Sequence, residues 1–103
     1  MGATVFTNTG VAPTAREAFQ RLQDEARYEY GHRGYTGTIA EKDSFMMIAC
    51  PVGHSAIDYA NELIDKDDPR IDDKWGPAGC IDLGPLPDDP HNHKFLFFGW
   101  ASE

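Results

Sequence analysis

Apolar residues recur every three or four positions in the first third of the chain. After Pro13 they occupy positions 15, 18, 19, 22, 26 and 30, with polar residues between them. This spacing predicts an amphipathic helix over about residues 14–30. Thr14 and Glu17 have the spacing of a capping box at its start, and Gly31 would end it.

A shorter stripe of the same kind predicts a second helix. Its apolar members are Ile57, Ala60 and Ile64, and Ser55 is placed as an N-cap. Residues 67–69 (Asp-Asp-Pro) would end this helix, because the residue before a proline disfavours helical geometry.

Five short runs rich in β-branched or aromatic residues predict strands. Residues 3–8 form the first run, 38–40 and 44–50 resemble a hairpin joined by a charged turn, and 78–83 and 94–101 follow the second helix. Residues 95–98 are apolar on both alternating faces, so we expect the last strand to be central or well covered.

The predicted fold is therefore one α+β domain spanning residues 1–103. It has a mainly antiparallel sheet of four or five strands with two helices on one face, in the order β-α-β-β-α-β-β. A chain of 103 residues with 41% hydrophobic residues can form such a core without metals or disulfides.

The charge is strongly negative and unevenly distributed. The formal net charge is −8, and residues 51–103 carry eleven Asp and Glu against four Lys and Arg. Such a chain repels phosphate backbones, so generic nucleic-acid binding is not expected. The acidic half is interpreted as a solvated face or as a docking surface for a basic protein. With no membrane-length apolar run and no secretory pattern at the N-terminus, a cytoplasmic location without membrane association is expected.

The cysteines and histidines give little support for redox or metal chemistry. Cys50 and Cys80 lie in apolar segments and are expected to be buried free thiols, although Cys50 and His54 are close enough in sequence for a nucleophile–base pair. His91 and His93 stand in a Pro- and Asp-rich loop, where solvation is favoured over weak chelation. No metal site and no cofactor are predicted.

Recognition chemistry is concentrated in residues 28–38. Arg33 has the geometry to bind an anion, Tyr35 can stack on a ring, and nearby threonines supply hydroxyls. The glycines and Tyr30 are explained equally well by the end of a helix and a turn. Lys74 and Trp75 would add a second cation and an aromatic wall, or Trp75 would seal the edge of the core. The predicted ligand-binding residues are His32, Arg33, Tyr35, Thr36, Thr38, Lys74 and Trp75.

No compact catalytic motif accompanies these residues, so no catalytic residue is assigned and binding is favoured over turnover. The alternative is a small hydrolase or lyase acting on an anionic substrate, with His32 as acid-base and Arg33 as anion clamp.

Several motifs resemble small uncharacterised proteins encoded by bacteriophages and prophages. They are Tyr30-Gly31, residues 35–40 (Tyr-Thr-Gly-Thr-Ile-Ala), 74–79 (Lys-Trp-Gly-Pro-Ala-Gly) and 97–101 (Phe-Phe-Gly-Trp-Ala). The resemblance implies a phage accessory protein in the host-cell cytoplasm. It would capture a small anionic, for example nucleotide-derived, ligand, or inhibit a basic host protein in counter-defence. A homo-oligomer in which two copies share a site would deepen its pocket.

Overall fold

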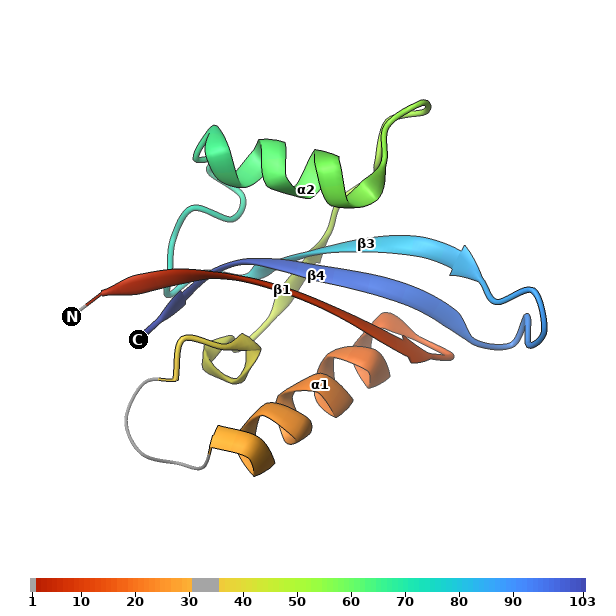
Figure 1. The fold of residues 1–103 in the computed structure, drawn as a ribbon, viewed down its shortest axis with the longest axis horizontal. Coiled ribbons are helices and arrows are strands. Elements are labelled where there is room, and N and C mark those ends of the chain that lie inside the picture. The colour runs from red at the N-terminus through yellow and green to blue at the C-terminus, as the bar shows by residue number, and fades with distance from the viewer. Residues whose placement is uncertain (1, 31–35) are drawn as a thin grey trace.

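The computed structural model describes residues 2–30 and 36–103, and Figure 1 shows their arrangement. Two helices accompany a four-stranded sheet, which confirms the predicted α+β class. The elements in chain order are β1 (Ala3–Ala12), α1 (Ala15–Tyr30), the 3₁₀ helix η1 (Ile39–Glu41), β2 (Phe45–Met47), α2 (Ala56–Asp65), β3 (Ala78–Pro85) and β4 (His93–Ser102).

The sheet has the strand order β1-β4-β3-β2. Strand β4 is antiparallel to both of its neighbours, β1 and β3, whereas β2 runs parallel to β3. The prediction of a mainly antiparallel sheet with a central last strand is therefore confirmed. Phe97 and Phe98 are both fully buried although they point to opposite faces.

The two helices cover opposite faces of the sheet, so the prediction that both pack on one face is wrong (Figure 1). Phe95 and Phe97 of β4 share a core with Phe19 of α1, while Leu96 and Phe98 share a second core with residues of α2. A strand that is apolar on both faces needs cover on both, because either face left open would expose aromatic and aliphatic side chains to water.

The predicted hairpin of residues 38–40 and 44–50 is also wrong. The first run forms η1, whose Ile39 is buried in the core below the sheet, and the second shortens to β2. Thr38 caps η1 by accepting a hydrogen bond from the Ala40 amide at 3.3 Å. Strand β2 then pairs in parallel with β3, a geometry that needs a crossover, here provided by α2.

The bounds of α1 and the start of α2 agree with the prediction, whereas α2 ends slightly earlier and β1 ends later than predicted. The Glu17 amide donates to Thr14 Oγ1 at 3.2 Å, as the capping spacing predicted. Ser55 occupies the N-cap of α2, but its side chain makes no capping hydrogen bond, and the helix ends at Asp65. Strand β1 extends to Ala12, four residues beyond its predicted end.

Candidate functional site

Three of the seven predicted ligand-binding residues, His32, Arg33 and Tyr35, lie outside the described residues, and so does the Gly31 predicted to end the first helix. The anion clamp, the ring-stacking role and the acid-base role assigned to them stay predictions. The other four, Thr36, Thr38, Lys74 and Trp75, are described.

The hydroxyl groups of Thr36 and Thr38 form hydrogen bonds that stabilise the start of η1. Their two Oγ1 atoms lie 2.7 Å apart, and the Thr36 hydroxyl donates to Glu41 Oε2 at 2.7 Å. The Thr36 amide donates to the same carboxylate oxygen at 3.0 Å. These hydroxyls therefore stand beside a carboxylate, which disfavours an anion at this point.

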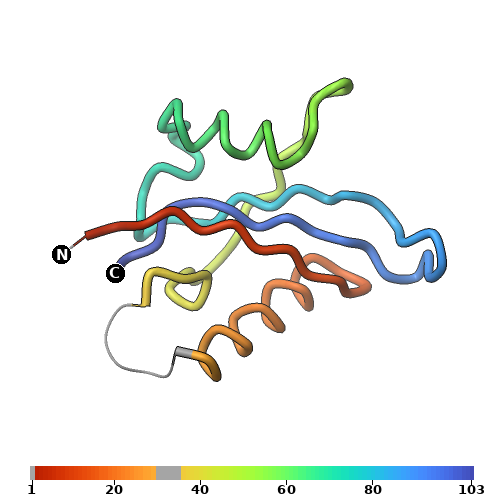
Figure 2. The backbone as a smooth tube through the Cα atoms, in the orientation of Figure 1, coloured from red at the N-terminus to blue at the C-terminus, as the bar shows by residue number. Residues whose placement is uncertain are grey.

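Lys74 lies at the same end of the sheet as these threonines. The Gly37 amide donates to the Ser102 carbonyl at the end of β4, and Lys74 Nζ lies 3.4 Å from the carbonyl oxygen of Gly2, just before β1. Figure 2 shows both segments beside the two termini. The structure thus gathers the described members of the predicted binding corner at one end of the molecule.

Trp75 is exposed over 55% of its surface, so it does not seal the core edge as one interpretation of the sequence proposed. Lys74 Nζ lies 5.3 Å from the centre of its ring, within the range of a cation–π contact. Trp100, by contrast, is half-buried against the core beneath α2.

Lys42 is a buried cation that the sequence pattern did not reveal. Its side chain is 2% exposed, and Nζ donates to the carbonyls of Asp73, Lys74 and Gly76 at 3.2, 3.3 and 3.0 Å. Desolvation lowers the pKa of this ammonium, and nearby Asp73 partly opposes that shift. Lys42 therefore anchors the turn that carries Lys74 and Trp75.

Gln23 fixes the other side of Lys42. This α1 side chain is nearly buried, and its amide donates to the carbonyls of Ile39 and Lys42. A continuous set of hydrogen bonds thus links α1, η1 and the turn before β3. A charged residue in a charged run, such as Lys42 between Glu41 and Asp43, gives no sign in sequence that it will turn inward.

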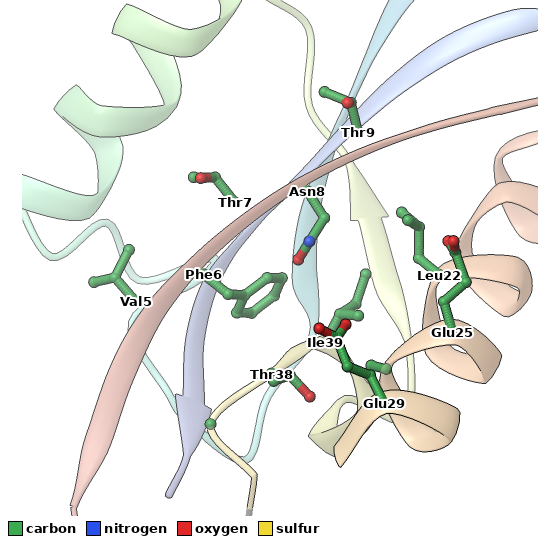
Figure 3. A pocket seen from close by; sticks show the side chains of 12 residues that line it. Val5, Phe6, Thr7, Asn8, Thr9, Leu22, Glu25, Glu29, Thr38 and Ile39 are labelled. Carbon is green, nitrogen blue, oxygen red and sulfur yellow. The ribbon is translucent and has the colours of Figure 1, made fainter.

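A groove of about 540 Å³ lies between β1 and the second half of α1 (Figure 3). Its floor is formed by residues of the η1 region, including Thr38 and Ile39. Phe6 and Asn8 point from β1 into the groove, whereas Val5 and Thr7 point to the other side of the sheet. We call this cavity the β1–α1 groove.

The groove closes where Gly10 meets Leu22. A Cβ atom at Gly10 would lie 3.1 Å from Leu22 Cδ1, so any larger residue here would require Leu22 to shift away from the strand. Toward Phe6 the space opens, and Glu25 and Glu29 of α1 face it together with the Asn8 amide (Figure 3).

The lining of the β1–α1 groove is acidic. Among the described residues that line it, Glu25 and Glu29 carry carboxylates and none is a lysine or an arginine. These two glutamates are four positions apart and therefore lie on the same side of α1. The groove is suited to a cationic or hydrogen-bond-donating ligand, and sequence analysis missed it because β1 and α1 were assigned only to the core.

The thiols are arranged as structural groups. Cys80 is fully buried, and burial raises its pKa to about 12, with the Asp82 charge adding to the effect, so the thiolate is strongly disfavoured. Cys50 is half-buried rather than buried, and its Sγ lies 3.5 Å from the carbonyl oxygen of His54. The His54 ring instead lies against Tyr59, with 6.0 Å between ring centres.

His93 pairs across the sheet. Its Nδ1 lies 3.0 Å from an Asp82 carboxylate oxygen, which joins β4 to β3. Partial burial would raise the pKa of Asp82, but hydrogen bonds from His93 and the Gly84 amide outweigh burial and lower it. Within residues 2–30 and 36–103, three or more metal-binding side chains do not cluster anywhere.

Among the described helices, neither α1 nor α2 has the length and apolarity needed to cross a bilayer. Comparisons of the chain with protein-family models, curated proteins and solved structures find no match. The class that the fold and the groove define is a small α/β/α sandwich with an acidic cleft along one sheet edge.

Proposed function

We propose that the protein is a non-catalytic binding protein that takes a basic segment of another protein into the β1–α1 groove. The observation that carries this proposal is the lining of the groove: among the described residues that line it, Glu25 and Glu29 are the charged ones. The net charge of −8 would attract a basic partner over a distance and increase its association rate.

Binding is favoured over turnover by the state of the described reactive groups. Cys80 holds its proton to high pH, and Cys50 faces backbone carbonyls rather than a base. A carboxylate pair on one helix side, facing an open groove, is chemistry for attracting cations.

The resemblance to phage-encoded proteins supports a host protein as the partner. We therefore propose that binding occurs in the host cytoplasm and blocks a basic surface of that protein, as a counter-defence factor would.

The test uses an eight-residue peptide of alternating lysine and threonine with blocked ends, titrated into the protein by calorimetry. Each lysine–glutamate pair at a partly exposed site is worth about 0.5 kcal/mol. The double variant Glu25→Gln/Glu29→Gln should therefore bind about fivefold more weakly.

The matched control removes two charges from the opposite face of the sheet. Asp58→Asn/Asp65→Asn, both exposed on α2, lowers the net charge equally but leaves the groove intact. Equal weakening in both double variants would show that only the overall charge matters. An absence of binding to the wild type would reject the proposed function.

Capture of a small anionic ligand is the second candidate, because Lys74 and Trp75 do present a cation over an exposed aromatic face. A nucleotide-derived ligand retained by the protein from the producing cell, detected in a native mass spectrum and lost in Lys74→Ala, would favour it. If the small molecule stays bound in both Lys74→Ala and Arg33→Ala, these residues do not form its binding site.

A further inference from the structure

Strand β1 is a long sheet edge that, within the part of the chain that the structure describes, lacks the usual protection. It is the terminal strand of the sheet, and its ten residues (Ala-Thr-Val-Phe-Thr-Asn-Thr-Gly-Val-Ala) include no charge and no proline. Its register with β4 is continuous from Ala3 to Ala12, with no bulge. Natural edges are normally blunted by such devices, because an open edge pairs readily with another strand. The opposite edge, β2, has only three residues.

The outward backbone groups of β1 belong to its odd-numbered residues. The Glu103 amide donates to the Gly2 carbonyl, which places the even-numbered residues on the β4 side. Arg21 Nη1 donates to the Val11 carbonyl from outside the pair at 2.9 Å. The amides and carbonyls of Val5, Thr7 and Thr9 therefore point to the free edge, directly above the opening of the groove.

We propose that the partner of the β1–α1 groove is an extended segment that adds to β1 as a fifth strand and carries basic side chains at alternate positions. Such a segment would direct every second side chain downward to α1 and the others to the α2 side of the sheet. This inference rests on the proposed function and names its mode of recognition, which is strand addition.

The spacing of the two glutamates matches an extended chain. Residues four apart on a helix are separated by about 6 Å along its axis. Alternate residues of a strand are separated by about 6.8 Å. Since α1 runs back along β1 (Figure 1), lysine or arginine at two alternate positions of the added strand can face Glu25 and Glu29 together.

A second copy of the chain is a less suitable occupant of the same edge. Pairing β1 with β1 would bring together two molecules that each carry −8 charges. It would also place the two acidic grooves beside the same interface, where like charges repel. A basic segment is instead attracted both by the net negative charge and by the carboxylates of the groove.

The experiment compares two isomers of the lysine–threonine peptide, N-methylated either at every lysine or at every threonine. One set of amides faces β1 and the other faces solvent, so one isomer should lose at least tenfold in affinity and the other should bind within about twofold of the parent. Loss with methylated threonines indicates antiparallel addition, and loss with methylated lysines indicates parallel addition.

Amide hydrogen exchange locates the added strand on the protein. With the parent peptide at saturation, exchange at Val5, Thr7 and Thr9 should slow by at least tenfold, while Phe6 and Asn8, already paired with β4, should change little. Thr7→Pro should abolish binding of the parent peptide and preserve the fold, because proline is tolerated where a strand amide faces outward. Ala56→Pro, at the first position of α2 and away from the edge, is the control and should bind normally, because proline is tolerated in the first turn of a helix.

The outcomes separate the two proposals. Equal binding of both isomers, together with weaker binding by Glu25→Gln/Glu29→Gln, would reject strand addition and keep the groove as the binding site. Protection of the three outward amides without peptide, in a protein that sediments as a dimer, would show that a second copy occupies the edge and would also overturn the inference. If the parent peptide does not bind, both proposals fail.

Discussion

Replacement of Lys42 by methionine is the sharpest test of how the fold positions the turn of residues 73–76. Methionine keeps most of the buried stem but removes the ammonium, so three carbonyls lose a donor at 3.0–3.3 Å. At about 1.5 kcal/mol for each charge-assisted hydrogen bond, the gross loss is about 4.5 kcal/mol. Desolvation of the ammonium, which lowers the pKa of Lys42, opposes the stabilisation from these three hydrogen bonds and offsets part of it. We therefore expect the free energy of unfolding to fall by about 2–3 kcal/mol.

The assay is urea unfolding at pH 7, followed by circular dichroism and tryptophan fluorescence. Lys66→Met is the matched control, because Lys66 is exposed and forms a surface ion pair with Glu62, so its loss should change stability very little. If Lys42→Met unfolds at the same urea concentration as that control, the three hydrogen bonds do not hold the turn.

The pH dependence of Lys42→Met gives a second readout. The pKa of Lys42 lies below 10.5 in the folded protein and near 10.5 in the unfolded chain. As the pH approaches 10.5, the folded protein therefore loses this proton before the unfolded chain does. Stability contributed by this residue therefore rises with pH in that range and is least at lower pH. The stability difference between wild type and Lys42→Met should widen from pH 7 toward pH 10.5, and a constant difference would contradict the assigned desolvation.

Two further predictions concern the caps and the thiols. Thr14→Ala should destabilise the protein by about 1 kcal/mol in thermal unfolding, because its hydroxyl accepts from the Glu17 amide, whereas Ser55→Ala should change little; equal losses would refute the assignment. A thiol reagent at pH 8 should modify Cys50 far faster than Cys80 in the native protein. The pKa of Cys80 is about 12 in the folded protein, so its contribution to stability is full below about pH 9 and is lost as the pH rises toward 12. The free energy of unfolding should fall by about 1.4 kcal/mol at pH 10 for this reason. Cys80→Ala should remove that pH dependence.

Local patterns in the sequence were sufficient for the elements with strong periodicity. The helical stripe from Ala15 to Tyr30 and its Thr14 cap were recovered, because both depend on contacts within four residues. The central position of β4 also followed from local information, since residues 95–98 are apolar at every position.

The errors arose where distant residues decide the outcome. Ile39 lies in a β-like run, yet the Thr38 cap and burial beneath the sheet favour η1. Strand β2 pairs with β3, more than thirty residues away, and no local pattern encodes that partner. Placing both helices on one face overlooked the second apolar face of β4.

The candidate site was predicted only in part. Lys74 lies at the same end of the sheet as Thr36 and Thr38, but the Thr36 hydroxyl is bonded to Glu41 and the Thr38 hydroxyl to Thr36 and the Ala40 amide. The β1–α1 groove depends on the approach of α1 to Gly10, a tertiary contact that leaves no trace in the spacing of residues. The described members of the predicted site therefore lie in loops, whereas the cleft is built mostly from regular elements.

A basic segment that binds in the β1–α1 groove changes the surroundings of the amides on β1 and on the facing side of α1. The most direct measurement is a nuclear magnetic resonance titration of the isotope-labelled protein with the lysine–threonine peptide, followed at every assigned amide. The largest shifts should occur at Thr7, Thr9, Glu25 and Glu29, with little change in α2. Shifts concentrated at Lys74 and Trp75, or spread evenly over the acidic surface, would contradict binding in the groove.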